Sequence, residues 1–446
     1  MRRSLLVFVV FLLAILGLVL CRTAALKGAQ TGLSTSAPPA PDLIARGKYL
    51  ATAADCISCH TGPGHVPFSG GVLLQTPFGL ISSPNITPDQ GTGIGGWTHE
   101  QFYRALHEGI APGYEWGIFP HYLYPAMPYT SYTKLSDADV MAIQAYLDSL
   151  PPVYAPRIAN QLMFPFNQRP VLALWRWLFF TTGPMATNSG WSAGIKRGAY
   201  LTVALGHCGE CHTPRNFMQA SIASKALGGA PIDNLFAPNI SSDSLYGVGG
   251  WSKKDLINYL QTGNSLPAGT AYGPMRMVIE NSTRHLSSTD LEDMADYLQH
   301  ATIPQATLPA ISIIHADASI ARGKVLYDSN CSACHGETGT GMPPFIPNLA
   351  GNGSVTAALP DNVISAALNG LTKGDNTMPA FGERFSNQQI ADIANYVRTA
   401  WGNKGAADAS ATQVRKLRRE GGEAVSMMMG RASCPTRDSG QPDKAN

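Results

Sequence analysis

The sequence predicts an all-α fold built from three tandem copies of one module. One observation is a C-x-x-C-H motif, which occurs three times in the 446 residues, at 56–60, 208–212 and 331–335. The other is that an amphipathic helical pattern of constant form follows each motif. Because both features recur together, we expect repeated domains of the same kind.

The motif has a specific chemistry. Two thiols three residues apart can bond as thioethers to the two vinyl groups of one haem, and the adjacent His then binds its iron. Three copies predict three covalently attached haem c groups and three tandem class I cytochrome c domains. The residues assigned to haem attachment are Cys56, Cys59, Cys208, Cys211, Cys331 and Cys334, and those assigned to iron are His60, His212 and His335.

Composition bounds the remaining classes. The formal net charge is +2 and charged residues make up 14% of the chain, so no bulk electrostatic argument points to nucleic acid. Of eight cysteines the motifs use six, which leaves Cys21 and Cys434 and no pair for a structural disulfide. A hydrophobic share of 44% is enough to build sizeable cores.

The N-terminus predicts export. Arg2 and Arg3 precede an unbroken run of apolar or small residues at 5–20, so residues 1–27 form a signal peptide or a short N-terminal anchor. Residues 28–41 are rich in small residues and Pro and predict a linker. Since covalent haem is attached outside the bacterial cytoplasm, we expect the periplasmic side of the cytoplasmic membrane.

The repeats set the domain boundaries. We predict cytochrome c domains at 42–152, 191–303 and 304–402, here called modules one, two and three, an interdomain or membrane-interface segment at 153–190, and a mobile basic tail at 403–446. An Arg-Gly pair begins each module, with the glycine at Gly47, Gly198 and Gly323. Glycine weakens an isolated helix, so its presence predicts close approach of a second helix.

That second helix is expected at the end of each module. Its apolar positions follow i, i+3, i+7, and a Ser with Asp or Gln three residues later resembles a capping box. The Ser residues are Ser136, Ser287 and Ser386, and a Tyr recurs at Tyr146, Tyr297 and Tyr396, which we expect to pack at the helix crossing. A Pro-Asn pair in each module, at Asn85, Asn239 and Asn348, predicts a turn in which Asn bonds nearby backbone.

A six-coordinate haem needs a second axial ligand, usually Met or His. In modules one and three a Met-Pro pair lies between the motif and the closing helix and offers Met127 and Met378. Met342 lies only seven residues after His335, too close to cross the haem. Module two offers two sulfurs: spacing to the closing helix favours Met277, whereas Pro-Met order favours Met275.

Residues 153–190 fall outside the repeat. Trp175-Arg176-Trp177 stands beside Leu and Phe in a run too short to span a bilayer. This pattern suits either a helix at a membrane or partner interface, or a linker helix packed across two modules.

Several segments resemble one known family, the triheme cytochrome c subunits of bacterial membrane-bound dehydrogenases for alcohols, aldehydes and sugar acids. They are Asn85-Ile86-Thr87-Pro88-Asp89, Tyr124-Pro125-Ala126-Met127-Pro128-Tyr129, Arg197-Gly198-Ala199-Tyr200-Leu201, residues 206–216 and Gly273-Pro274-Met275. The resemblance covers about residues 42–402 and selects Met275 over Met277 as the ligand. Arg276-Met277 and the tail depart from the family pattern.

The resemblance implies a non-catalytic role in electron transfer. Such subunits accept electrons from a large dehydrogenase subunit carrying PQQ, flavin or molybdopterin and pass them to ubiquinone. An alcohol or aldehyde dehydrogenase is the first expectation and a gluconate or sugar-acid enzyme the next. The alternatives are a stand-alone haem peroxidase, which needs an open iron position, and a free-standing carrier that delivers to a terminal oxidase.

Overall fold

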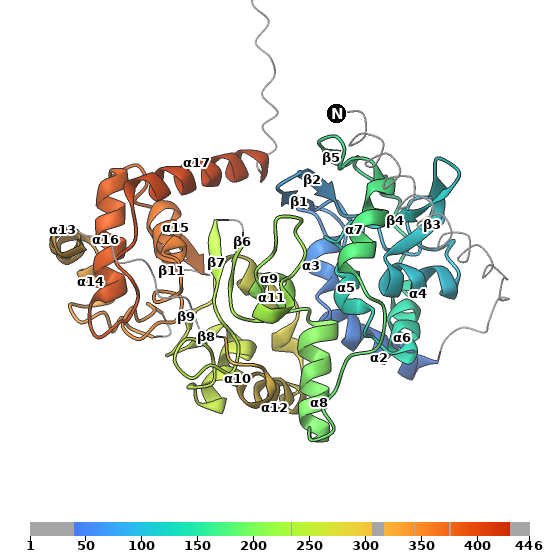
Figure 1. The fold of residues 1–446 in the computed structure, drawn as a ribbon, viewed down its shortest axis with the longest axis horizontal. Coiled ribbons are helices and arrows are strands. Elements are labelled where there is room, and N and C mark those ends of the chain that lie inside the picture. The colour runs from blue at the N-terminus through green and yellow to red at the C-terminus, as the bar shows by residue number, and fades with distance from the viewer. Residues whose placement is uncertain (1–39, 233, 306–315, 344, 374–375, 429–446) are drawn as a thin grey trace, which may run out of the picture. The chain divides into compact units, whose positions relative to one another are not determined.

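The computed structural model describes residues 40–232, 234–305, 316–343, 345–373 and 376–428 (Figure 1). The predicted signal peptide or anchor at 1–27 and nearly all of the linker at 28–41 lie outside them. The chain forms two compact units: unit 1 comprises residues 1–233 and 237–307, and unit 2 comprises residues 234–236 and 308–446. Modules one and two therefore share unit 1, and most of module three lies in unit 2.

Module one is framed by its first and last helices. The entry helix α2 (Pro41–Ala53) packs against the closing helix α6 (Asp137–Asp148), and the two lie side by side in Figure 1. Between them the chain forms α3 (Cys56–His60), β1 (Leu73–Thr76), β2 (Gly79–Ser82), α4 (His99–Glu108), β3 (Ile110–Glu115), β4 (Phe119–Tyr122) and α5 (Tyr129–Tyr132). The first haem motif thus forms a one-turn helix directly after the entry helix.

Module two repeats this arrangement in the same unit. Entry helix α8 (Ala193–Ala199) continues as a π-helical turn over Tyr200–Leu205 and packs against closing helix α12 (Ser288–Asp296), itself followed by a π-helical turn over Tyr297–Ala301. Between them lie α9 (Gly209–His212), β6 (Ala230–Ile232), β7 (Leu235–Ala237), α10 (Lys253–Thr262), β8 (Asn264–Ser265), β9 (Gly269–Thr270) and α11 (Gly273–Asn281). The second haem motif supplies α9.

Unit 2 holds the third copy. Its entry helix α13 (Ala316–Asn330) packs against closing helix α16 (Asn387–Thr399). The other elements are α14 (Ser332–His335), α15 (Asp361–Asn369), β10 (Leu371–Lys373), β11 (Asn376–Met378) and α17 (Ala411–Met428). Tyr327 is fully buried at this crossing and lies against Tyr396 and Trp401.

The predicted close approach at the entry glycines is confirmed. A Cβ built on each glycine would overlap a backbone carbonyl of the closing helix: 1.8 Å from the Ala142 oxygen at Gly47, 1.8 Å from Asp293 at Gly198 and 2.0 Å from Asp392 at Gly323. No side chain fits such a gap, so glycine at this position brings the two backbones into contact. Tyr146 and Tyr396 lie at the same crossings, with Cβ atoms 2.9 Å from the built positions on Gly47 and Gly323.

The prediction of an all-α fold is incomplete. Short antiparallel pairs join β1 with β2, β3 with β4, β8 with β9 and β10 with β11, and β5 (Gln161–Leu162) extends the first pair. These strands are two to six residues long, and most of them pair with the next strand as a hairpin. Strands this short carry too little periodicity to be recognised in the sequence. They line the loops between the helices, while the helices supply most of the buried core.

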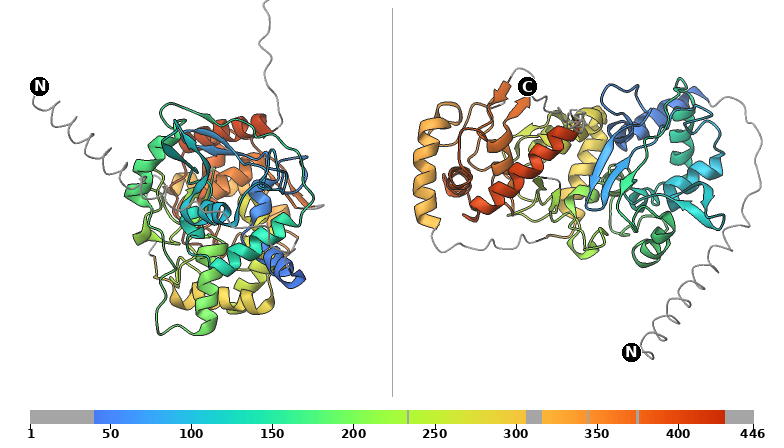
Figure 2. Two further views of the ribbon diagram at one scale, coloured as in Figure 1. Left: turned by 90° about the vertical axis from the view of Figure 1, so that its right-hand side faces the viewer. Right: turned by 90° about the horizontal axis from the view of Figure 1, so that it is seen from above.

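The predicted mobile tail is wrong for its first part. Helix α17 lies along α15 and α16, and the views of Figure 2 show it, in red, across the orange helices of the same unit. Val414 and Leu417 are buried, and Arg418 donates to the Asn387 side chain and the Phe385 carbonyl. The basic residues that suggested a solvated segment form one face of a helix whose apolar face packs into unit 2.

Candidate haem-attachment sites

The six motif cysteines lie on, or directly before, the one-turn helices that follow each entry helix; Cys208 and Cys331 are the N-cap residues of α9 and α14. None of them forms a disulfide. Cys59 and Cys334 are exposed, and the other four are half-buried. In the first motif, burial raises the pKa of the Cys56 thiol to about 12. Each motif thus presents two unlinked sulfurs one helical turn apart, as thioether attachment requires.

All three motif histidines are buried, and each makes the same kind of hydrogen bond to a proline carbonyl. The Nδ1 atom of His60 lies 2.8 Å from the Pro84 carbonyl oxygen; the matching distances are 2.6 Å from His212 to Pro238 and 3.1 Å from His335 to Pro347. A carbonyl oxygen only accepts, so Nδ1 carries the proton and Nε2 keeps its lone pair. Burial also lowers the pKa of each imidazole, although the carbonyl contact opposes that effect.

This arrangement fits an iron ligand. A metal-binding His donates its other ring N–H to a carbonyl or carboxylate, which fixes both tautomer and ring orientation. The accepting carbonyls belong to the Pro residues of the Pro-Asn pairs, and the predicted bonding of their asparagines to nearby backbone is confirmed. Asn85 Nδ2 donates to the Val153 carbonyl at 2.7 Å, and Asn348 Nδ2 to the Ala350 carbonyl at 2.7 Å. The residues present therefore suit a c-type haem at each motif.

The methionines predicted as axial ligands differ in their surroundings. Met127 and Met275 are half-buried and pack against the core of unit 1, whereas Met277 is 48% exposed. Met378 is half-buried at the end of β11 in unit 2. Met342, discarded on spacing, is 58% exposed. Of the two sulfurs in module two, the one on Met275 faces the interior.

Comparison with known proteins gives the family. Residues 44–151 match the Cytochrome c family, and residues 318–397 match the family described as cytochrome c oxidase, cbb3-type, subunit III. The chain is 36% identical over 402 residues to the cytochrome c subunit of alcohol dehydrogenase (quinone) from Gluconobacter oxydans, covering 85% of this chain and 83% of that protein. The chain belongs to the family of cytochrome c subunits of membrane-bound dehydrogenases.

Two further relatives are also named as cytochrome subunits of dehydrogenases. The fructose dehydrogenase cytochrome subunit of Gluconobacter japonicus is 37% identical over 412 residues, which cover 85% of this chain and 83% of that protein. The gluconate 2-dehydrogenase cytochrome c subunit of Pantoea cypripedii is 36% identical over 409 residues, which cover 85% of this chain and 90% of that protein. As in these subunits, the function of this cytochrome c subunit is electron transfer.

Sequence reasoning missed two sets of residues around the first two haem motifs. One is a set of Arg, Asp and Tyr side chains that joins modules one and two and includes Arg46, Tyr49 and Asp139. The sequence held one signal for this set. A Tyr stands two residues after the entry glycine in modules one and two, whereas module three has Val325 at that place. The other is Asp55, a carboxyl that is only 9% exposed and directly precedes Cys56.

The segment between the modules packs as a linker helix on one face and leaves its other face exposed. Helix α7 (Leu172–Phe179), which follows a 3₁₀ turn at Arg169–Val171, buries Trp175, whose Nε1 donates to the Met218 carbonyl at 2.8 Å. Trp177 and Leu178 on the same helix are 54% and 50% exposed. One face therefore packs as a linker within unit 1, while the other presents apolar side chains to the surroundings.

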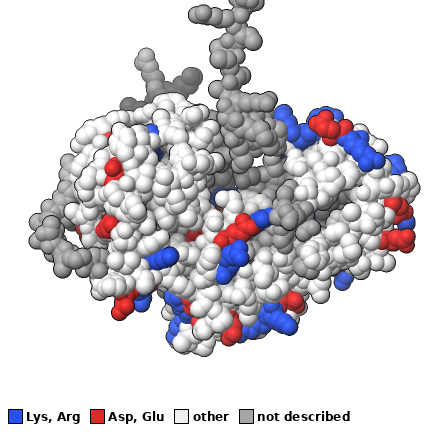
Figure 3. Space-filling view, turned by 180° about the vertical axis from the view of Figure 1, so that it is seen from behind, with Lys and Arg blue, Asp and Glu red and all other residues white. Residues whose placement is uncertain are grey.

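The described part of the chain contains no helix long and apolar enough to cross a membrane, and no cluster of three or more His, Cys, Asp or Glu side chains placed to hold a metal ion. On the face drawn in Figure 3, charged side chains of both signs lie interspersed, with broad uncharged areas between them. This distribution agrees with the formal net charge of +2.

Proposed function

We propose that this cytochrome c subunit carries three haem c groups and relays single electrons from a catalytic dehydrogenase subunit to ubiquinone at the periplasmic face of the cytoplasmic membrane. The attaching pairs are Cys56 with Cys59, Cys208 with Cys211 and Cys331 with Cys334. Each iron would be held by one His and one Met: His60 with Met127, His212 with Met275 and His335 with Met378. Each haem iron would supply one-electron chemistry at a potential raised by its thioether ligand.

One observation carries the count of three. Every motif histidine is buried and donates Nδ1–H to the carbonyl of a Pro-Asn turn, at 2.8, 2.6 and 3.1 Å. A lone C-x-x-C-H can arise by chance, but three equivalent histidines held in the same tautomer indicate one function repeated three times. The third lies in unit 2, within the residues that match a second cytochrome family.

The residues of the chain contribute orientation and protection rather than bond chemistry. The Pro84, Pro238 and Pro347 carbonyls hold each imidazole in one orientation and keep Nε2 available as a ligand. The helix crossings at the entry glycines fix each motif relative to its module core. A buried, rigid ligand set needs little rearrangement when iron changes its charge, which suits rapid electron transfer.

The proposed partner is a large dehydrogenase subunit with PQQ, flavin or molybdopterin. Relatives are named as subunits of alcohol, fructose and gluconate dehydrogenases. We take an alcohol or aldehyde as the first substrate class and gluconate or another sugar acid as the next. Purification of the native complex, followed by ubiquinone reduction with ethanol, acetaldehyde and gluconate in turn, identifies the class. A chain purified without a large subunit would contradict the proposal.

The haem count and ligands are tested by spectroscopy. We expect three haems per chain by alkaline pyridine assay and low-spin ferric spectra with a sulfur-to-iron charge-transfer band. Met275→Leu should turn one of the three haems high-spin, whereas Met277→Leu, at an exposed neighbour, should leave all three unchanged. A high-spin haem in the unmodified protein would favour peroxidase chemistry instead.

Membrane contact is proposed for the exposed face of α7. Aromatic and aliphatic side chains beside a basic residue are typical of helices that lie in the membrane interface. Trp177→Ser with Leu178→Ser should shift the protein from the membrane to the soluble fraction. Trp175 is buried, so it is excluded from the test because its loss would disturb packing. Leu245→Ser, at another exposed apolar residue, is the control, and unchanged fractionation of the double variant would remove this role.

A further inference from the structure

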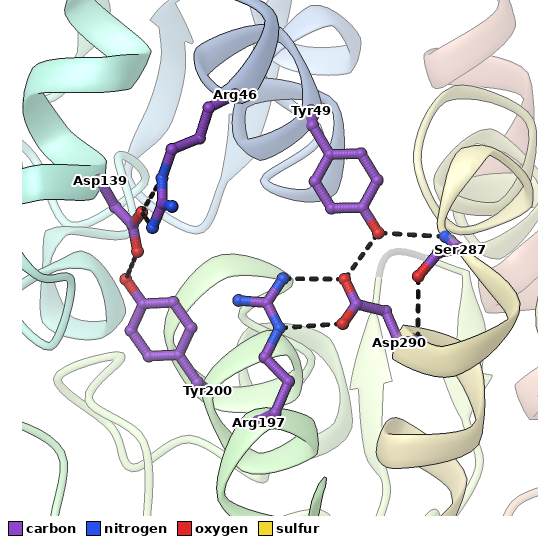
Figure 4. Close-up of polar contacts among 7 residues, drawn as sticks. All are labelled: Arg46, Tyr49, Asp139, Arg197, Tyr200, Ser287 and Asp290. Atoms are coloured by element: carbon purple, nitrogen blue, oxygen red, sulfur yellow. Dashed lines mark hydrogen bonds and ion pairs between the residues drawn. The ribbon is translucent and has the colours of Figure 1, made fainter. Parts of the chain in front are cut away.

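Two tyrosines of unit 1 make the same contact in opposite directions. Tyr49 of module one donates its hydroxyl to Asp290 Oδ2 in module two at 2.6 Å. Tyr200 of module two donates to Asp139 Oδ2 in module one, also at 2.6 Å (Figure 4). Both tyrosines stand two residues after the entry glycine of their own module. The entry helix of each module therefore reaches the closing helix of the other.

Each tyrosine also completes a helix cap across the module boundary. The Ser287 backbone N–H donates to the Tyr49 hydroxyl at 3.0 Å, and the Ser136 N–H to the Tyr200 hydroxyl at 3.1 Å. In an ordinary capping box this N–H bonds to the side chain three residues later. Module three does this itself, because the Ser386 N–H donates to Gln389 Oε1 at 2.9 Å.

Modules one and two have no such internal cap because the equivalent carboxylates are held by arginines. Arg46 donates twice to Asp139 Oδ1, at 2.7 and 3.1 Å, and Arg197 donates to both Asp290 oxygens at 2.8 and 2.9 Å. Burial by itself raises the pKa of Asp290, but hydrogen bonds from Arg197 and Tyr49 outweigh it and hold that pKa below its usual value. Two largely buried carboxyl groups, each paired with an arginine, thus anchor the contact.

A second reciprocal contact bonds the haem motif of each module to a residue of the other module. Ser58 and Glu210 occupy the same place, between the two cysteines of their motifs. Asn281 of module two donates to the Ser58 hydroxyl at 2.8 Å, and Thr130 of module one donates to Glu210 at 2.9 Å. Each motif is therefore bonded to the segment before the other module's closing helix, so both motifs lie at the boundary between the two modules.

Module three lacks the elements of the pair. Val325 stands where the tyrosines stand and is 66% exposed, and Gln389 replaces the aspartate. The reciprocal contact is therefore a property of modules one and two, not of the repeat as such.

We propose that modules one and two form a pseudo-two-fold electron-exchange pair, in which Tyr49 and Tyr200 are positioning residues that fix the first two haem-attachment motifs relative to one another. The proposal rests on the haem assignment of the proposed function. The residues His60 and His212 would each hold one haem iron, and the pair would supply one-electron exchange in which one iron is oxidised as the other is reduced, with no bond made or broken. The tyrosines act through the relative placement of the modules and do not contact either iron.

The first test measures the cross-module cap. In Tyr49→Phe the exchange of the Ser287 amide hydrogen should speed up by on the order of tenfold, because a lost hydrogen bond of this kind contributes about 1.5 kcal/mol. In Tyr200→Phe the same should happen at Ser136. Each variant should act on the module that does not contain it. Tyr327→Phe, which removes a buried hydroxyl bonded to the Gly336 carbonyl within unit 2, is the matched control.

The second test measures electron exchange. After rapid one-electron reduction of the fully oxidised chain, redistribution between the haems of modules one and two should slow by about tenfold or more in the Tyr49→Phe, Tyr200→Phe double variant. It should stay unchanged in Tyr327→Phe. Equal rates in the double variant and the unmodified chain, with three haems bound in each, would overturn this inference alone. Fewer than three haems in the unmodified chain would overturn the proposed function as well.

Discussion

The buried carboxyl group of Asp55, beside the first haem motif, should make the stability of the protein depend on pH. The residue lies immediately before Cys56 with a left-handed backbone, φ 50°, and its carboxylate accepts a hydrogen bond of 2.5 Å from the Ser58 hydroxyl. That donor is neutral, so it compensates only partly for the loss of water. Burial therefore raises the pKa of Asp55 to about 7.

The consequence for stability has a definite sign. A rise from 3.8 to about 7 corresponds to about 4 kcal/mol, at about 1.4 kcal/mol for each pKa unit. Below the unfolded pKa both states are protonated and there is no penalty. Between the two values the unfolded chain loses its proton while the folded chain keeps it, so stability falls as the pH rises. Above about pH 7 the penalty is complete.

Asp55→Asn isolates this effect. Asparagine accepts the Ser58 hydrogen bond, tolerates the left-handed backbone and already occupies the equivalent place in module three as Asn330. We expect the variant to match the unmodified protein near pH 4 and to exceed it by up to about 4 kcal/mol above pH 7.

The assay is urea unfolding of the haem-bearing chain from about pH 4 to about pH 8, followed by circular dichroism. Asp42→Asn, at an exposed carboxylate in the first turn of α2, controls for charge alone. If Asp55→Asn differs from the unmodified chain by the same amount at every pH, or is the less stable protein at pH 8, then Asp55 is not buried as an isolated carboxyl and the reasoning fails.

Three further predictions concern Asp55, the helix crossing at Gly47 and the core of unit 2. Because an ionised Asp55 stabilises the added charge of ferric iron, the potential of the nearest haem should fall as the pH rises through about 7, and redox titration of Asp55→Asn should show a flat profile. Gly47→Ala should destabilise unit 1 by about 3 kcal/mol or more through the overlap at its helix crossing, while Gly91→Ala, with its nearest neighbour 3.7 Å away, should be nearly neutral in the same urea titration. Arg398→Met should destabilise unit 2 by about 3 kcal/mol or more, since it leaves the buried Val355 and Ala357 carbonyls and the half-buried Leu359 carbonyl without this donor, and amide exchange in unit 1 should not change.

Much of the fold followed from the repeat. The entry glycines, the closing helices and their serine caps could be placed because each depends on local spacing or on a contact that recurs three times. The sheets could not, since strands of a few residues have no reliable period. The exposed basic residues of α17 suggested mobility, whereas its two buried residues, Val414 and Leu417, decide that it docks. Two apolar positions on a short polar segment are too weak a pattern to separate these outcomes.

The capping boxes show the limit most clearly. The pattern of Ser followed by an acid or amide three residues later is present in all three modules, yet only Ser386 with Gln389 closes the box internally. In the other two modules the side chain at that place is an aspartate, which Arg46 or Arg197 draws away from the cap over a separation of 93 residues. The open N–H is then satisfied by a tyrosine of the neighbouring module. The choice between aspartate and glutamine therefore decides whether a module caps its closing helix itself or needs a partner. Unit 1 holds the two modules with aspartate, and each supplies the tyrosine hydroxyl that caps the closing helix of the other.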